Sequence, residues 1–184
     1  MQNRFSKTFG AGEHSKIVIA PGRVNLIGEH TDYNDGLVCP MAIEPSVQIA
    51  FRARSDSKVI IESMQFEDSR LEFDLKNSIE PTSPQHDWSN YIKGIASELI
   101  KAGYKLKGME AVLSSTLPVG AGLSSSAAVE VGMGLALVHS AKLSIDPMQL
   151  AHLAVNAERN FAGVNVGIMD QTIVAAGRRD HAML

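Results

Sequence analysis

Residues 117–128 read L-P-V-G-A-G-L-S-S-S-A-A, and this stretch constrains the fold more than any other part of the chain. Gly120 and Gly122 allow positive φ angles and a close approach to a ligand, and three serines then lead into an apolar helix. A helix start presents about four unpaired backbone N–H groups and roughly half a positive charge. The stretch therefore predicts a preformed anion site whose natural occupant is a phosphate group. It also fits a buried helix that a serine caps after a glycine turn.

The charge of a bound phosphate needs a further partner. The stretch has no lysine of the kind found in a G-x-x-x-x-G-K-[ST] phosphate loop. About half a charge from a helix start cannot offset a triphosphate, which indicates a divalent cation such as Mg²⁺. Ser126 supplies a hydroxyl and Glu158, on a later predicted helix, supplies a carboxylate. Glu158 also fits an ordinary solvated helix glutamate.

Length and composition bound the class of the protein. The chain has 184 residues, enough for one domain with a sizeable core, and its net charge of -3 offers no basic face for nucleic acid. We therefore expect a small-molecule partner. The N-terminus lacks an apolar signal core and no stretch approaches about 18 apolar residues, so we expect a soluble, cytoplasmic protein with no membrane partner. Cys39 is the single cysteine, which excludes an internal disulfide, and we interpret it as a small core residue.

Hydrophobic periodicity and turn residues divide the chain into a polar N-terminal segment, residues 1–15, and one domain, residues 16–184. Strands are predicted near residues 16–20, 23–28, 37–41, 47–54, 59–63, 71–75 and 109–115, and helices near residues 88–102, 124–141, 147–162 and 170–176. Pro21, Pro40 and Pro45 are interpreted as breaks between strands. Residues 76–87 are interpreted as a surface connection, and residues 181–184 as the start of a further strand.

Two of the predicted helices carry more detailed signals. Gly132 and Gly134 lie inside an almost wholly apolar helix, where each costs about 1 kcal/mol relative to alanine, so another element should pack closely there. The next helix is predicted to begin at Pro147 with Asp146 as its cap and Gln149 returning the capping bond.

A dense polar turn, E-H-T-D-Y-N-D-G at residues 29–36, follows the second predicted strand. Glu29, His30 and Asp32 could bind sugar hydroxyls, because a carboxylate accepts two such bonds and discriminates against a missing hydroxyl. The same residues also fit a polar surface turn.

The residue pattern favours phosphoryl transfer over hydrolysis or zinc chemistry. The serine stretch has glycine on one side only, unlike a hydrolase nucleophile elbow, and no histidine pair has zinc spacing. Phosphoryl transfer needs a phosphate cradle, a metal ligand, a proton acceptor and positive charge near the transferred group. Asp170 is the candidate proton acceptor, and Arg23 the candidate cation. Asp170 also fits a helix cap, and Arg23 a surface edge position.

Together, three segments resemble the galactokinases of the GHMP kinase superfamily: G-R-V-N-L-I-G-E-H-T-D-Y-N at 22–34, L-P-V-G-A-G-L-S-S-S-A-A at 117–128 and G-I-M-D-Q at 167–171. The segment W-S-N-Y-I-K-G at 88–94 is also similar to a galactokinase segment near the adenine. The resemblance implies an α+β fold, the GHMP kinase amino-terminal domain (ribosomal protein S5 domain 2-like), with a mixed β-sheet layered against helices. The implied reaction is ATP-dependent phosphorylation of the anomeric hydroxyl of α-D-galactose.

The resemblance also implies roles for individual residues. Asp170 would accept the hydroxyl proton, with Arg23 orienting it. An unperturbed aspartate, with a pKa near 3.9, is a weak base at pH 7, so positioning must supply much of the rate. The implied substrate-binding residues are Glu29, His30, Thr31, Asp32 and Gly167; the implied ATP-binding residues are Trp88, Gly120, Ala121, Gly122, Leu123, Ser124, Ser125 and Ser126; and the implied Mg²⁺ ligands are Ser126 and Glu158.

The chain departs from the galactokinase pattern in one respect. Galactokinases have a second, carboxy-terminal GHMP domain of similar size that closes over the cleft, and this chain ends before it. We therefore expect a truncated form with weak nucleotide binding and slow or no turnover, or a module whose missing half comes from another chain. A non-catalytic galactokinase-like sensor of sugar and ATP is an alternative, as is another GHMP small-molecule kinase. The intact serine run at 124–126 and the presence of Asp170 favour the enzyme.

Overall fold

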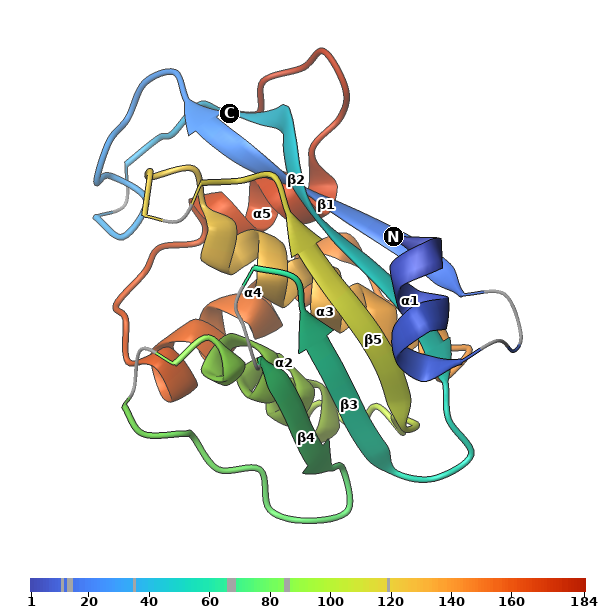
Figure 1. The fold of residues 1–184 in the computed structure, drawn as a ribbon. Helices are drawn as coiled ribbons and strands as arrows, with labels where there is room; N and C mark the ends of the chain where they lie inside the picture. The colour runs from blue at the N-terminus through green and yellow to red at the C-terminus, as the bar shows by residue number, and fades with distance from the viewer. Residues whose placement is uncertain (11, 13–14, 35, 66–68, 85–86, 119) are drawn as a thin grey trace.

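A mixed five-stranded sheet in the order β1-β2-β5-β3-β4 forms the frame of the molecule (Figure 1). The computed structural model describes residues 1–10, 12, 15–34, 36–65, 69–84, 87–118 and 120–184. The strands are β1 (Lys16–Asn25), β2 (Pro40–Ala53), β3 (Lys58–Ser63), β4 (Arg70–Asp74) and β5 (Met109–Ser115). The helices are α1 (Gln2–Phe9), α2 (Ser89–Lys101), α3 (Ser125–Ser140), α4 (Pro147–Ala157), the π-helical turn η1 (Glu158–Ala162) and α5 (Met169–Ala176). This arrangement confirms the expected α+β fold.

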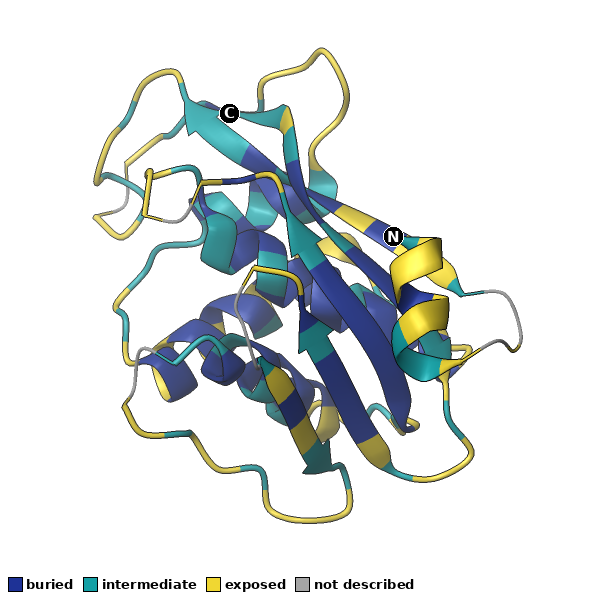
Figure 2. Cartoon of the chain, viewed as in Figure 1, coloured by how far each residue is buried: buried dark blue, intermediate teal, exposed yellow. Residues whose placement is uncertain are grey.

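The core lies between one face of the sheet and helices α2 to α5. Strands β2 and β5 run antiparallel, β3 pairs parallel with β5, and β1 and β4 form the edges through antiparallel pairs. Alternate residues of the central strands point toward the helices, as Ile49, Phe51 and Ala111 do in the main apolar cluster. Figure 2 shows the dark blue of buried residues on β3, β5 and the helices behind them (Figure 2).

Strands β1 and β2 are continuous where prolines were expected to break them. Pro40 is the first residue of β2, where a missing N–H is tolerated. Pro45 lies in β2 opposite an irregularity in β1, since the register passes from Pro21 paired with Ser46 to Arg23 paired with Ala42. The extra residues of this bulge belong to β2, where residues 43–45 lie opposite Gly22 alone, and the register shift ends at Arg23.

The N-terminal segment forms a helix, α1, that the residue pattern did not predict. It lies on the sheet face opposite to the other helices (Figure 1), where Phe5 packs with Ala50 and Val112. The guanidinium of Arg52 lies 5.3 Å from the centroid of the Phe5 ring. One buried aromatic side chain therefore anchors an otherwise polar helix.

Helix α3 passes through the centre of the core, as its composition indicated. A Cβ at Gly132 would lie 3.0 Å from Ala20 Cβ, and one at Gly134 would lie 2.7 Å from Leu150 Cδ1. Both glycines are therefore required by close packing against β1 and α4, which confirms that prediction.

Helix α4 begins as predicted but ends differently. The side chain of Asp146 accepts bonds from the N–H groups of Met148 and Gln149. The expected return bond from Gln149 is wrong, because its Oε1 accepts a hydrogen bond from the Tyr104 hydroxyl at 2.9 Å. The last turn widens into η1 and closes at Gly163, whose φ is 68°.

Smaller features complete the fold. Ala182 forms an isolated bridge with Met41, which fits the expected start of a strand there. Cys39 is half-buried, so its interpretation as a core residue was wrong. None of the described helices is long and apolar enough to cross a membrane.

Candidate active site

Gly22, on the β1 side of the bulge, lies directly on the glycine-serine stretch at residues 117–126, here called the phosphate loop. A Cβ on Gly22 would lie 2.3 Å from Leu117 Cδ2 and 2.9 Å from the Leu123 carbonyl oxygen. The Arg23 N–H donates to that carbonyl at 3.2 Å. The missing side chain of Gly22 thus lets the strand contact the loop, and the next residue is the candidate cation.

The phosphate loop has the open backbone expected of an anion site. Gly120 and Gly122 have φ angles of 73° and 69°, and a methyl group on either would meet nothing within 4 Å. The N–H groups of residues 120–126 meet no hydrogen-bond acceptor among the described residues, which leave out residue 119. Ser124 precedes α3 in the left-handed region, and its side chain makes no capping bond. A serine-capped structural turn is therefore the wrong interpretation of this loop.

Arg23 and Asp170 form a bidentate ion pair between β1 and α5. Arg23 Nε lies 2.7 Å from Asp170 Oδ1, and Nη2 lies 2.9 Å from Oδ2. The side chains are 14% and 27% exposed. Arg23 is therefore a partnered, largely buried cation, and its alternative as a surface edge residue was wrong. Asp170 is the second residue of α5, after Met169, so it is not the helix cap.

This pair is joined to the phosphate loop by two further hydrogen bonds. Arg23 Nη1 donates to the Gly122 carbonyl at 2.6 Å, and the Ser124 hydroxyl donates to Asp170 Oδ2 at 2.5 Å. The carboxylate thus accepts three bonds, which hold it in one orientation. A hydroxyl placed beside Asp170 would lie next to the loop's free amides.

The polar turn at 29–36 contacts α5 through Asp32. Its Oδ2 accepts the Met169 N–H at 3.1 Å, and a Cβ on Gly167 would lie 1.8 Å from the same oxygen. Gly167 therefore leaves the space that Asp32 occupies. Because Met169 is adjacent to Asp170, this contact brings the polar turn beside the ion pair.

The other side chains of the turn are bonded within it or to its neighbours. The Thr31 hydroxyl lies 2.9 Å from the Gly28 carbonyl and 2.8 Å from the Leu37 carbonyl. In this geometry Thr31 stabilises the turn. The exposed side chains of the turn have one contact each: Glu29 Oε1 accepts from Asn25 Nδ2 at 3.0 Å, and His30 Nδ1 lies 2.7 Å from the Tyr33 hydroxyl.

Glu158 is buried at the start of η1, with only 4% of its surface exposed. Its interpretation as a solvated glutamate was therefore wrong. Burial is the main cause that raises the pKa of Glu158, while a hydrogen bond from Ser126 lowers it. Ser126 is in the first turn of α3, so the carboxylate lies beside the helix start that the phosphate loop leads into.

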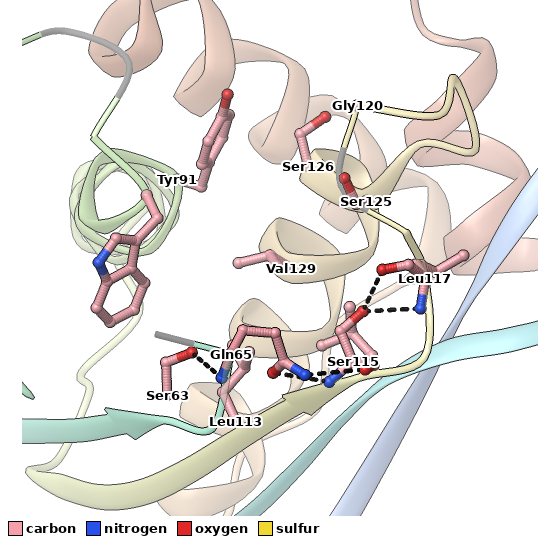
Figure 3. Close-up of a pocket in the computed structure, with 12 residues that line it drawn as sticks. Ser63, Gln65, Tyr91, Leu113, Ser115, Leu117, Gly120, Ser125, Ser126 and Val129 are labelled. Carbon is pink, nitrogen blue, oxygen red and sulfur yellow. Dashed lines mark hydrogen bonds between the residues drawn. The ribbon is translucent and has the colours of Figure 1, made fainter. Parts of the chain in front are cut away.

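A cavity of about 380 Å³ opens on the other side of the phosphate loop. Figure 3 shows Tyr91 on one side of it and Ser125 and Ser126 on the other (Figure 3). Trp88 and Val129 also line it, and most of the lining is apolar. An apolar slot with a free-amide loop at one end suits a flat heterocycle carrying phosphates.

Comparisons with known proteins agree with this geometry. Residues 3–53 match a family model described as the galactokinase galactose-binding signature, and residues 90–178 match the GHMP kinases N terminal domain. Galactokinases from Chloroflexus aggregans and Roseiflexus sp. are 44% and 45% identical over 98% and 100% of the chain. A crystal structure of Lactococcus lactis galactokinase complexed with galactose matches 98% of the chain with a TM-score of 0.93 and 37% identity.

The chain matches the amino-terminal portion of galactokinases, and it carries the N-terminal domain of the GHMP kinases. It spans a little under half the length of these relatives, covering 45%, 46% and 47% of the three chains. The galactose-binding signature covers nearly all of α1 together with β1, the polar turn and β2, whereas the GHMP model covers the phosphate loop and the helices that carry Glu158 and Asp170. The Arg23–Asp170 ion pair joins these two matched segments.

The donors present fit a magnesium ion. Ser126 and Glu158 provide hard oxygen ligands beside the phosphate loop, and Mg²⁺ is usually bound by one or two carboxylates together with substrate phosphates. No group of three or more His, Cys, Asp or Glu among the described residues could hold a metal ion by itself. The site thus fits a metal that arrives with a nucleotide.

Sequence reasoning missed two polar residues of this candidate site. Glu130 and Gln171 are both 0% exposed, and both face Glu158. Burial first, and Glu158 second, raises the pKa of Glu130 well above its usual range. Glu130 is the one charged residue of α3 apart from His139, which could have marked it. Gln171 lies in the G-I-M-D-Q segment and was given no role.

Proposed function

We propose that this chain is the galactose- and ATP-binding part of a galactokinase, a phosphotransferase that makes galactose 1-phosphate. The observation that carries the proposal is the Arg23–Asp170 ion pair, with Nε to Oδ1 at 2.7 Å, held against the phosphate loop by Gly122 and Ser124. A phosphoryl acceptor beside Asp170 and a nucleotide on the loop would meet there.

The proposed reaction transfers the γ-phosphoryl group of ATP to galactose. The anomeric hydroxyl oxygen of galactose forms a bond to the γ-phosphorus of ATP, and the bond from that phosphorus to the bridging oxygen breaks with its electron pair leaving on ADP. The hydroxyl proton passes to an oxygen of Asp170. Three hydrogen bonds fix that carboxylate, so correct placement supplies much of the catalysis.

The remaining residues have supporting roles in this proposal. The guanidinium of Arg23 offsets negative charge that develops on the transferred group. The free N–H groups of residues 120–126 bind phosphate oxygens, and Trp88 and Tyr91 border the slot for the adenine. Ser126 and Glu158 hold Mg²⁺, which when bound neutralises phosphate charge and orients the phosphates.

Galactose is the proposed acceptor because the polar turn belongs to the segment that matches the galactose-binding signature. Glu29, His30 and Asp32 offer acceptors and a ring nitrogen for sugar hydroxyls, and Asp32 is the one fixed beside Asp170 through Met169. Thr31 shapes the turn, and Gly167 gives Asp32 its space. We expect this carbohydrate kinase to act in the cytoplasm.

The isolated chain should be an impaired form of the enzyme. Glu29 and His30 are exposed, and the chain spans under half of its relatives' length, so more of the sugar's surroundings would come from elsewhere. We propose weak nucleotide binding and slow turnover for these 184 residues by themselves, and a higher rate when a complementary half is added as another polypeptide.

The test uses the single tryptophan of the chain, Trp88, which lines the cavity. ADP with Mg²⁺ should change its fluorescence saturably, and galactose should give saturation-transfer NMR signals that glucose does not. Long incubation with ATP and galactose should yield galactose 1-phosphate by ³¹P NMR. Binding of both ligands with no product at all, even with a complementary half, would favour the sensor alternative. Absence of nucleotide binding would refute the proposal.

A further inference from the structure

Three polar side chains meet inside the core behind the phosphate loop. Glu130 of α3 and Gln171 of α5 are 0% exposed, and Glu158 of η1 is 4% exposed. Burying a charged carboxylate is costly unless hydrogen bonds compensate it, and this chain buries two of them together. Such a cluster is a poor way to stabilise a core, so it calls for a functional reason.

Gln171 lies between the two carboxylates and contacts both. Its Nε2 donates to Glu158 Oε2 at 2.7 Å and lies 3.4 Å from Glu130 Oε2. The bond to Glu158 is short and the one to Glu130 is long, so the amide chiefly holds Glu158. Glu130 Oε1 and Gln171 Oε1 have no partner among the described residues. Ser126 and Glu130 also hydrogen-bond to Glu158, so the short contact from Gln171 is one of three that hold this carboxylate.

The position of Gln171 in α5 connects Glu158 with the proposed proton acceptor. Gln171 directly follows Asp170, and successive helix residues point about 100° apart. Asp170 turns toward Arg23 and the polar turn, whereas Gln171 turns into the core toward Glu158. One turn of α5 therefore fixes the proposed proton acceptor on one side and the proposed metal ligand on the other.

We propose that Gln171 is a positioning residue for the metal site: its amide holds the Glu158 carboxylate in the orientation that, with Ser126, binds the magnesium of a nucleotide. Glu130 limits the movement of the Gln171 amide from the other side. The proposal rests on the proposed function, since it concerns the metal ligand of that site. Groups that orient a metal ligand in this way are typically worth about 10–100-fold in metal affinity.

The experiment compares ADP affinity with Mg²⁺ and with EDTA by isothermal titration calorimetry on the full 184-residue chain. Wild type should bind ADP more tightly with Mg²⁺. Gln171→Met keeps the length and buried volume but removes the amide. It should keep the metal-free affinity within about twofold and lose about tenfold of the magnesium-dependent gain. Electron paramagnetic resonance of Mn²⁺ with ADP should show the same loss in metal affinity.

Thr172→Val is the matched control. Thr172 is the next residue of α5, and its buried hydroxyl has no partner among the described residues, so its loss should leave both affinities unchanged. If Gln171→Met does not fold by circular dichroism, Gln171→Asn, which keeps the amide but shortens its reach, takes its place.

The outcomes separate this inference from the proposed function. An unchanged magnesium-dependent gain in the folded Gln171 variant would overturn the positioning role while leaving the kinase proposal intact. An equal loss in Thr172→Val would also overturn it, because any change in α5 would then suffice. No ADP binding by the wild type would refute the proposed function and this inference together.

Discussion

The carboxylates on the two sides of helix α5, at Asp170 and next to Gln171, differ in their exposure and in their hydrogen-bond partners. On the Asp170 side, the carboxylate accepts bonds from Arg23 and Ser124 and remains 27% exposed. On the Gln171 side, Glu158 accepts bonds from Gln171 and Ser126, whereas Glu130 Oε1 and Gln171 Oε1 have no partner among the described residues. The Asp170 carboxylate is therefore partly open to water, whereas the Glu158 carboxylate is buried beside a second carboxylate.

This difference indicates what each side requires from a ligand. A fully bonded carboxylate beside water can receive a proton without rearrangement, because its orientation is already set. A carboxylate buried beside a second one gains more from a cation, since the cation compensates part of the desolvation cost of burial. The Asp170 side is therefore expected to govern turnover, and the Glu158 side the binding of the metal-nucleotide.

The largest expected effect is on turnover. Asp170→Asn keeps the shape of the side chain but removes the proton acceptor, so galactose phosphorylation should fall by about 10²–10⁴-fold. ADP affinity should stay within about threefold, because the loop amides are untouched. Product formation by ³¹P NMR and calorimetry of ADP binding measure the two quantities. Retained turnover in the folded variant would show that Asp170 is not the acceptor.

The next effect is on stability and comes from the partner of Asp170. Arg23→Met leaves the carboxylate and the Gly122 carbonyl without their donor, and should lower the free energy of unfolding by about 2–3 kcal/mol. Lys58→Met is the control, because its ion pair with Glu72 is 50% and 41% exposed, and exposed pairs contribute little to stability. Urea unfolding compares them, and equal losses would mean that the buried pair is not specially stabilising.

Local sequence patterns predicted the positions of several helices and strands. Turn residues and periodicity located α2, α3, α4 and β5 close to their observed bounds, because Gly103, Asp146 and Pro147 mark ends that depend on neighbouring residues only. The convergence of Arg23 and Asp170, which lie 147 residues apart, came from the family resemblance, since no local pattern encodes such a distance.

The sequence could not reveal features that depend on the sheet as a whole. Pro21 and Pro45 look like strand breaks, and only the pairing of β1 with β2 shows that both fall at one bulge. Helix α1 looks polar because its anchor is the single residue Phe5. The partners of Glu130 come from two other helices, so its burial could be suspected from α3 but not its role.

Two glycine substitutions separate ligand binding from packing. Gly122→Ala places a methyl group in open space at a φ of 69°, so it should cost about 1–2 kcal/mol of stability and also lower ADP affinity by obstructing the anion site. Gly134→Ala forces the methyl group against Leu150 Cδ1 at 2.7 Å, and should cost about 1–2 kcal/mol without changing ADP affinity per folded molecule. Calorimetry and urea unfolding measure both. Equal ADP affinities in the two variants would argue against phosphate binding at residues 120–126.

The smallest expected effect is on stability, and it comes from the surface ion pair between Arg54 and Asp56, far from α5. It tests whether a bidentate arginine-carboxylate pair stabilises the fold. A hydrogen bond from Arg54 lowers the pKa of Asp56 to about 2. A lowered folded-state pKa means that the pair contributes stability above the unfolded pKa of 3.8 and loses it as pH falls through about 2. Asp56→Asn should therefore be slightly less stable than wild type at pH 6, with the difference vanishing near pH 2. Thermal unfolding followed by circular dichroism at both values measures it, and a gap that widens in acid would contradict the sign. Because the pair is at the surface, high salt should shrink the difference at pH 6.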